Sequence, residues 1–172
     1  MLTQELGKEL KKPGFTTFLP YLSGERTPHN EAGIRGAFYG LAHQSDRASL
    51  TQAVLEGVAF AFRDNLEALR AAGTTLERVT AVGGGSKSPY WIKALATALG
   101  LPVDIPAKGD FGAAFGAARL GLIAVENADP VAICTPPKMA RTVEPDRRFS
   151  GAYAVAYGRY RDLYPAIKGI SS

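Results

Sequence analysis

The stretch VTAVGGGSKSPYW, residues 79–91, runs a β-branched segment into three consecutive glycines and then into Ser88-Pro89. β-Branched residues favour strands. Serine followed by proline is typical of a helix start, because serine caps a free N–H and proline at the first helical position needs no acceptor. We therefore expect a strand, a turn and a helix. One glycine satisfies such a turn, so the run Gly83, Gly84 and Gly85 indicates a backbone that a ligand approaches closely.

The same alternation continues after this stretch. A helix is expected over 89–99 and ends at Gly100, a strand follows over 102–105, and Asp110 is expected to cap the helix FGAAFGAARLGLIA. Strands and helices that alternate with short links form parallel sheets covered by helices. In such sheets ligands bind beyond the carboxyl ends of the strands, which is where the glycines lie. The sequence thus predicts an α/β fold with a ligand site at the glycines.

The rest of the chain is assigned by its periodicity and its turn residues. We expect a helix end or linker over 1–14, strands over 15–22 and 36–41, a charged loop over 23–33, a long helix over 45–73 and an amphipathic helix over 151–167. Ser45 or Asp46 is expected to cap the long helix. Its apolar residues crowd more than one face, so central burial is expected, and Gly57 within it indicates close packing. The tyrosines of the last helix are interpreted as packing residues.

Composition excludes several classes of function. The net charge is +4, but the basic residues are scattered and follow no nucleic-acid-binding pattern, so a small anionic ligand explains the sign equally well. No apolar run reaches the roughly 20 residues of a membrane span. The single Cys134 favours a reducing cytoplasm, and His29 and His43 lack the spacing of a protein-ligated metal site.

The glycine run alone leaves the ligand open. The phosphate-binding pattern GxxxxGK[ST] is absent. A dinucleotide fingerprint is half matched, with Gly83-x-Gly85 followed by Asp104 at the end of the next strand, but Ser88 replaces the third glycine. An NAD-dependent, Rossmann-like oxidoreductase module with Asp104 on the ribose therefore stays as an alternative.

Three segments together resemble the second half of the FGGY family of carbohydrate kinases. They are PYLSGERTPHNEAGIRGAFYGL, ASLTQAVLEGVAFAFRDNL and VGGGSKSPYWIKALATALGLPV with DFGAAFGAA. The family's cluster Gly-x-apolar-x-Gly-apolar fits Gly36, Phe38, Gly40 and Leu41. Ser49 departs from the acidic, amide or histidine residue expected before the following apolar run, which indicates an altered helix entry. The resemblance covers about residues 15–168.

The resemblance implies a fold and a nucleotide site. The fold is the ribonuclease-H-like α/β core of actin, hexokinase and Hsp70, and the ligands are ATP or ADP, with Mg²⁺ held mainly through the nucleotide phosphates. The glycines form the adenosine motif, and the residues implied at the site are Gly83, Gly84, Gly85, Ser86, Lys87 and Ser88. Valine at Gly84 or Gly85 is expected to abolish nucleotide binding and to leave the fold intact. Lys87 is either a phosphate partner or a solvated lysine.

Two other segments receive weaker assignments from the same resemblance. Glu25 and Arg26 either pair with each other or reach the cleft between the two kinase domains. Asp110 and the small residues of GAAFGAA are expected to build a helix beside the floor of the nucleotide site.

No catalytic residue is assigned to this chain. The family's catalytic aspartate and its DxG- and GTS-type phosphate loops precede the matched region. We therefore expect a linker remnant over 1–14 and the C-terminal nucleotide-binding portion over 15–172, as a truncated polypeptide, a proteolytic remnant or a split-gene product. Alone it is expected to be inactive, and to use its exposed surface for the missing N-terminal half or for self-association.

The substrate of the complete enzyme follows only from the resemblance. It favours a ketopentose, D-xylulose, and glycerol, gluconate, ribulose and fuculose remain open. A non-catalytic interaction module derived from a kinase is the remaining alternative.

Overall fold

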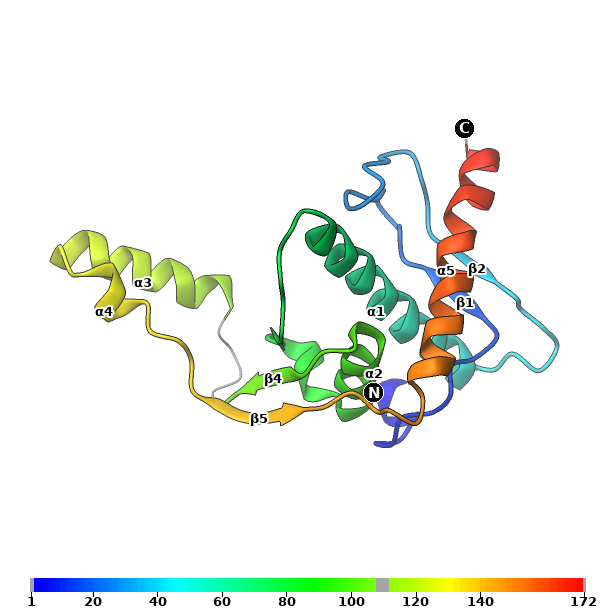
Figure 1. Cartoon of the computed structure of the whole chain (residues 1–172), viewed down its shortest axis with the longest axis horizontal. Helices are drawn as coiled ribbons and strands as arrows, with labels where there is room; N and C mark the ends of the chain where they lie inside the picture. The colour runs from blue at the N-terminus through cyan, green and yellow to red at the C-terminus, as the bar shows by residue number, and fades with distance from the viewer. Residues whose placement is uncertain (1, 108–111, 172) are drawn as a thin grey trace.

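The computed structural model describes residues 2–107 and 112–171 and is mixed α/β. Its chain runs from a small N-terminal hairpin through a mixed sheet to a long C-terminal helix (Figure 1). The elements are η1 (Leu2–Gln4), β1 (Thr17–Leu19), β2 (Ala37–Tyr39), α1 (Arg47–Ala71), β3 (Val79–Thr80), η2 (Gly84–Lys87), α2 (Pro89–Leu99), β4 (Val103–Pro106), α3 (Ala113–Glu126), α4 (Pro130–Ile133), β5 (Met139–Val143) and α5 (Ser150–Ser171).

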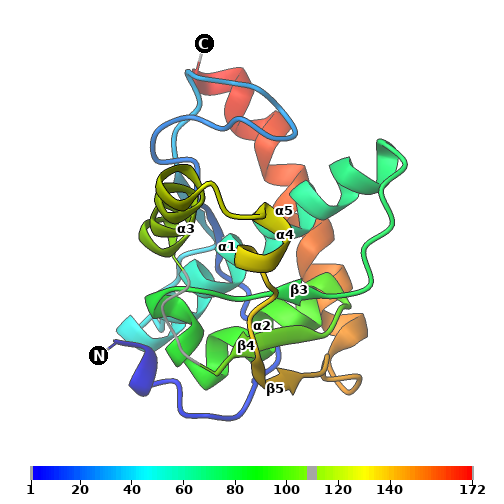
Figure 2. The ribbon, with the colours of Figure 1, turned by 90° about the vertical axis from the view of Figure 1, so that its left-hand side faces the viewer.

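The two sheets confirm the α/β alternation and extend it. β1 pairs with β2 in antiparallel fashion. In the second sheet, β3 and β4 are parallel, as the sequence predicts, and β5 adds an antiparallel strand at the far edge of β4 (Figure 2). Strand β5 was not predicted from the sequence, because four of its five residues are exposed and no alternation of apolar and polar residues marks it.

The prediction of a helix end over 1–14 is wrong. Among residues 2–14 only Leu2–Gln4 form a helical turn, a short 3₁₀ turn, and Gly7 then adopts a left-handed conformation with φ of 79°, which a right-handed helix does not continue. The segment is held by packing, since Leu6 and Leu10 are buried in the core.

Helix α1 begins as predicted and shows why Ser49 departs from the family pattern. Asp46 is the N-cap, and its Oδ1 accepts a hydrogen bond from the Ser49 N–H at 2.7 Å. The Ser49 hydroxyl accepts in return from the Asp46 N–H at 2.9 Å, which completes a capping box. The side chains of Asp46 and Ser49 thus each satisfy one backbone donor at the helix start.

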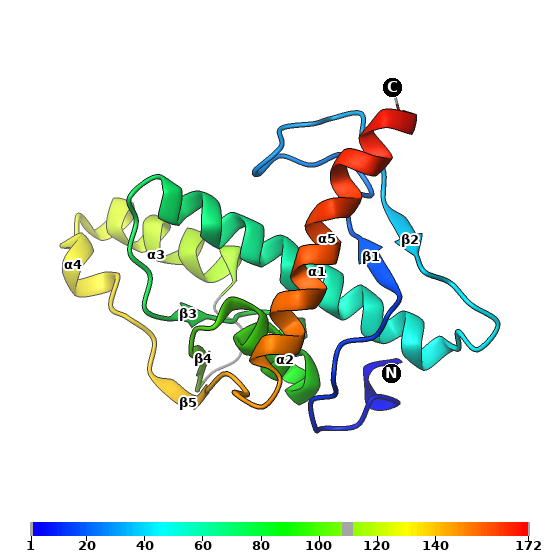
Figure 3. The ribbon, with the colours of Figure 1, turned by 45° about the vertical axis from the view of Figure 1, so that its right-hand side comes forward.

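Helix α1 is buried on one side rather than all round. It packs on β1 and α2, and α5 crosses it (Figure 3). At this contact Gly57 lies so close to β1 that an added Cβ atom would stand 2.2 Å from the Phe18 carbonyl oxygen, which confirms the predicted close packing. Near its C-terminal end Phe62 and Leu69 are 49% and 45% exposed, so the expected central burial holds only for the opposite face.

Helix α5 confirms the interpretation of the tyrosines as packing residues. Tyr153, Tyr157 and Tyr160 are buried in the core. The Tyr157 hydroxyl donates to Asp64 Oδ1 on α1 at 2.6 Å, and the Tyr160 hydroxyl donates to the Tyr21 hydroxyl at 3.1 Å.

No helix within residues 2–107 and 112–171 is long and apolar enough to cross a bilayer.

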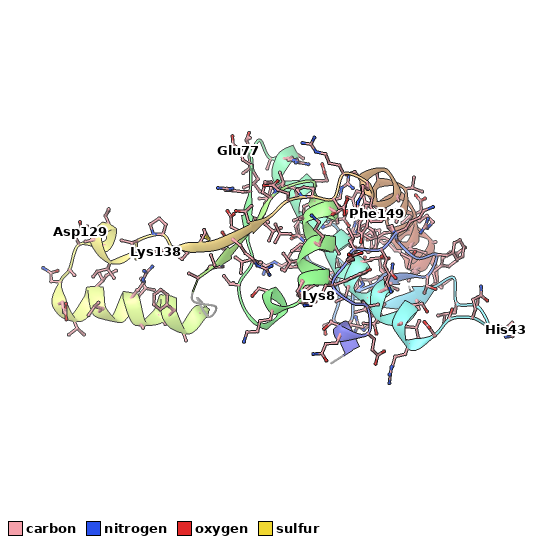
Figure 4. The ribbon with its side chains drawn as sticks, turned by 90° about the horizontal axis from the view of Figure 1, so that it is seen from below. Lys8, His43, Glu77, Asp129, Lys138 and Phe149 are labelled. Carbon is pink, nitrogen blue, oxygen red and sulfur yellow. The ribbon has the colours of Figure 1, made fainter. Side chains whose placement is uncertain are left out.

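Helices α3 and α4 form an arm that extends from the rest of the chain (Figures 1 and 4). None of the described residues of α3 is buried, and the Arg119 guanidinium ties it to the carbonyl oxygen of Thr135 at 3.0 Å. The expected cap Asp110 lies outside the described residues. The described helix begins at Ala113, with Gly112 in the N-cap position.

A buried carboxylic acid lies beside the contact of α1 with β1. Glu56 is 3% exposed, and its Oε1 accepts from Gln52 Nε2 at 2.7 Å. Burial raises the pKa of Glu56 from 4.5 to about 7, although hydrogen bonds from Gln52 and the Gly14 backbone and the charge of Arg159 oppose that shift.

We expect Glu56→Gln to change how the stability of the chain depends on pH. Between pH 4.5 and about 7 the folded state keeps a proton on Glu56 that the unfolded state releases, so the native chain loses stability as pH rises through this window. Glutamine does not titrate. Urea unfolding measures the free energy of unfolding of both chains. The value for Glu56→Gln minus that for the native chain should rise by on the order of 3 kcal/mol from the acidic to the alkaline end of the window. Parallel pH profiles for the two chains would contradict this assignment.

Candidate nucleotide-binding site

The three glycines lie where the sequence places them, between the carboxyl end of β3 and the start of α2. The Ala81 N–H donates to the Asp104 carbonyl oxygen at 2.9 Å, so the chain follows β4 up to the turn. Gly83 then adopts φ of 83°, a conformation that favours glycine. Ser88 caps α2 by accepting from the Trp91 N–H at 3.3 Å, and Pro89 occupies the first helical position. The predicted strand, turn and helix are confirmed.

The glycines differ in what surrounds them. An added Cβ at Gly84 meets no atom within 4 Å, so this backbone is open to a ligand. An added Cβ at Gly85 would stand 2.0 Å from the Trp91 ring. Valine at Gly85 would therefore displace the Trp91 indole, so Gly84 is the position at which valine fits without moving a neighbour.

An apolar cavity of about 410 Å³ lies beside this turn, between α1, β3 and α2. Ser86 and Trp91 line it next to the glycines, and Phe62 and Leu69 line it from α1. The Trp91 indole Nε1 is buried and has no hydrogen-bond partner among the described residues. A cavity of this size and lining suits a flat, largely apolar ring with a few polar atoms.

Comparison with known proteins identifies the domain. The model of the FGGY family of carbohydrate kinases, C-terminal domain, matches residues 3–125. The chain belongs to the FGGY family. Among curated relatives, the xylulose kinase of Klebsiella pneumoniae is 40% identical over 156 residues, which are 90% of this chain and 32% of that protein.

Solved structures of FGGY kinases share the fold of this chain. The crystal structure of a xyloylose kinase from Brucella ovis is 64% identical with a TM-score of 0.89, and covers 98% of this chain and 35% of that one. The xylulose kinase from Rhodospirillum rubrum is 27% identical with a TM-score of 0.79, over 99% of this chain and 34% of that one. The FGGY chain thus spans about a third of the length of the relatives it matches, and has the actin- and hexokinase-like fold of this family.

Ser86 and Lys87, in the turn at residues 83–88, have different surroundings. Ser86 is buried, and its hydroxyl donates to the Gly83 carbonyl oxygen at 2.7 Å, so it stabilises the turn. Lys87 is exposed and forms no ion pair within the described part of the chain. Its ammonium is therefore available to an anionic group at the turn.

Asp104 does not serve a ribose. It is 3% exposed, its Oδ1 accepts from the Thr142 hydroxyl at 2.6 Å, and its Oδ2 lies 3.1 Å from Arg78 Nε. The carboxylate on β4 thus contacts β5 and the residue that precedes β3. With both oxygens used and the family established, the oxidoreductase alternative is wrong.

The loop that carries Glu25 and Arg26 contacts α5 rather than the glycine turn. The Glu25 carboxylate accepts from the backbone N–H of His29 at 2.8 Å, and no ion pair with Arg26 occurs in the described ranges. The His29 ring stacks on Tyr164 with centroids 3.5 Å apart, and Glu31 pairs with Lys168 at 3.1 Å. The expected Glu25–Arg26 pair is therefore not formed, and a contact with a domain cleft stays a prediction.

Neither the cavity nor the place of Trp91 in its lining was predicted from the sequence. Phe62 and Leu69 come from α1, Val82 follows β3 and Trp91 lies in α2, so only the tertiary fold brings these residues together. The one sequence signal for the cavity was the pair of apolar residues Phe62 and Leu69 on α1. They were expected to be buried within the long helix.

Proposed function

We propose that this chain supplies the nucleotide-binding part of an ATP-dependent sugar kinase. The observation that carries the proposal is Gly84, whose open backbone stands between the end of β3 and the capped start of α2 in an FGGY domain. Bare backbone lets an adenosine group approach closely, and the free N–H groups and dipole of α2 favour its phosphates. The apolar cavity lined by Ser86 and Trp91 supports the same reading, since it offers an aromatic ring a place beside the turn.

The proposed substrate is D-xylulose, because several relatives bear the name xylulose kinase. Phosphoryl transfer to a sugar hydroxyl needs positioning, charge neutralisation and a proton acceptor. In this proposal the chain positions the nucleotide, and Lys87 is available to the phosphates. Mg²⁺, if held mainly through those phosphates, would offset their charge. In this proposal the proton acceptor and most of the sugar pocket come from the part of the kinase that precedes the region matched by this chain.

We expect the 172-residue chain alone to turn over no D-xylulose. It has no GTS or DxGT phosphate loop, so it lacks the groups that clamp the transferred phosphate. A coupled assay of ADP release, with ATP, Mg²⁺ and D-xylulose, should stay at the rate measured without sugar. Sugar-dependent ADP release at a normal kinase rate would show that the chain carries a complete active site.

The arm formed by α3 and α4 is a second place for contact with a partner. Leu120, Val125 and Val131 on it are 66%, 86% and 80% exposed. In our proposal this surface packs on the remainder of the kinase, and self-association of the isolated chain is its consequence.

A further inference from the structure

A basic groove lies on the side of α2 that faces β5. It shares no lining residue with the apolar cavity, although Pro89, which directly follows Ser88, is one of the residues that line it. It has a volume of about 330 Å³ and is built from the N-terminal segment, α2, β5 and the loop before α5. Its charged side chains are Lys8, Glu9, Lys93, Arg141, Asp146 and Arg148. Four cations against two anions leave a net charge of +2 on a small concave surface.

Local structure aims these cations at one space. Arg141 and Val143 line the groove together, because side chains two apart on β5 share a face. The intervening Thr142 bonds to Asp104 instead. Lys93, one turn into α2, donates to the Glu144 carbonyl oxygen at 2.8 Å, which fixes its ammonium beside the end of β5.

The two anions balance half of this positive charge. Asp146 binds Arg148 through two contacts, from Nε at 3.0 Å and from the terminal nitrogen at 2.8 Å, and this guanidinium holds the pKa of Asp146 at about 2. The backbone N–H of Asp146 donates to the Thr97 hydroxyl on α2 at 2.9 Å, so the Asp146–Arg148 pair is anchored to the helix. Lys8 and Arg141 have no carboxylate partner in the described part of the chain, and Lys93 bonds only a neutral carbonyl.

We propose that this groove binds the phosphate group of a small phosphate monoester, with Lys8, Lys93 and Arg141 as its cationic ligands. A phosphate dianion matches the net charge, and arginine and lysine are the side chains that bind it best. The volume lies at the low end of the range for small-molecule sites, so we match the groove to a phosphate ester of about pentose size. Its three cationic ligands line neither the glycine turn nor the apolar cavity, so the proposal does not require that the turn bind ADP.

Calorimetric titration of the 172-residue chain with ribose 5-phosphate tests the proposal, with inorganic phosphate and ribose as the comparison ligands. We expect saturable binding of ribose 5-phosphate at about 1 mM or tighter, weaker binding of inorganic phosphate and none of ribose. Arg141→Met and Lys8→Met, both at exposed positions, should each weaken ribose 5-phosphate binding about tenfold, because each removes a charge-assisted contact.

Lys138→Met is the matched control, since Lys138 lies at the root of the arm, away from Lys8 (Figure 4). It should change the affinity less than about twofold, which separates a built site from general attraction by a positive chain. Gly84→Val should leave the affinity unchanged. The proposal is overturned if ribose 5-phosphate shows no saturable binding, if Lys138→Met weakens it as much as Arg141→Met, or if inorganic phosphate binds as tightly as the ester.

Discussion

Gly84→Val is expected to weaken ADP binding to this chain at least tenfold while the chain stays folded. No atom lies within 4 Å of an added Cβ at Gly84, so the native structure accepts the side chain without displacing a neighbour. Gly84 lies in the 3₁₀ turn η2 and does not have the positive φ that excludes valine. The space that valine fills is the space proposed for the nucleotide. A tenfold loss of affinity corresponds to about 1.4 kcal/mol of binding free energy, and a steric clash between valine and ADP costs at least that much.

The matched control for this variant is Gly151→Val. Gly151 also has open space around its Cβ position, but it lies in the first turn of α5. Both variants should keep the native circular dichroism spectrum, and only Gly84→Val should lose affinity in an ADP titration. Equal ADP affinities for the native chain and Gly84→Val would remove the nucleotide from the glycine turn.

Gly57→Ala is expected to destabilise the chain by about 3 kcal/mol or more. Alanine is the better helix former by roughly 1 kcal/mol, so helix propensity alone predicts the opposite sign. Packing decides, because the added Cβ would stand 2.2 Å from the carbonyl oxygen of Phe18 and 3.0 Å from its carbonyl carbon. Backbone cannot rotate away as a side chain does, so α1 must separate from β1, and the core around Leu19 and Phe60 loosens with it.

Gly158→Ala is the control for this effect. Gly158 lies inside α5, and no atom lies within 4 Å of its added Cβ. Urea unfolding should therefore show Gly158→Ala neutral or more stable by up to about 1 kcal/mol. If Gly57→Ala were as stable as Gly158→Ala, the close contact of α1 with β1 would be wrong.

The elements with local end signals were predictable from sequence. Helix α2 has the predicted bounds because Ser88 and Pro89 begin it, and Gly100, with φ of 67°, ends it. Asp46 likewise sets the start of α1. These signals act within a few residues of chain, so no knowledge of the tertiary structure was needed.

The elements and sites that failed prediction depend on contacts between distant residues. Strand β5 is exposed and is a strand only because β4 offers it a partner edge. Leu6 and Leu10 have helical spacing, but the left-handed Gly7 between them places both in the core without a helix. The basic groove joins Lys8, Lys93 and Arg141, which no local pattern relates.

The central claim is that the turn at residues 83–88 is where a purine nucleotide binds, and its most direct test is an ADP titration followed by backbone amide resonances. We expect saturable shifts at Gly84 and its neighbours in η2, together with a shift of the Trp91 indole N–H beside the cavity. Shifts that occur only in the basic groove or on the arm, or no shifts at all when ADP is in large excess, would contradict the claim.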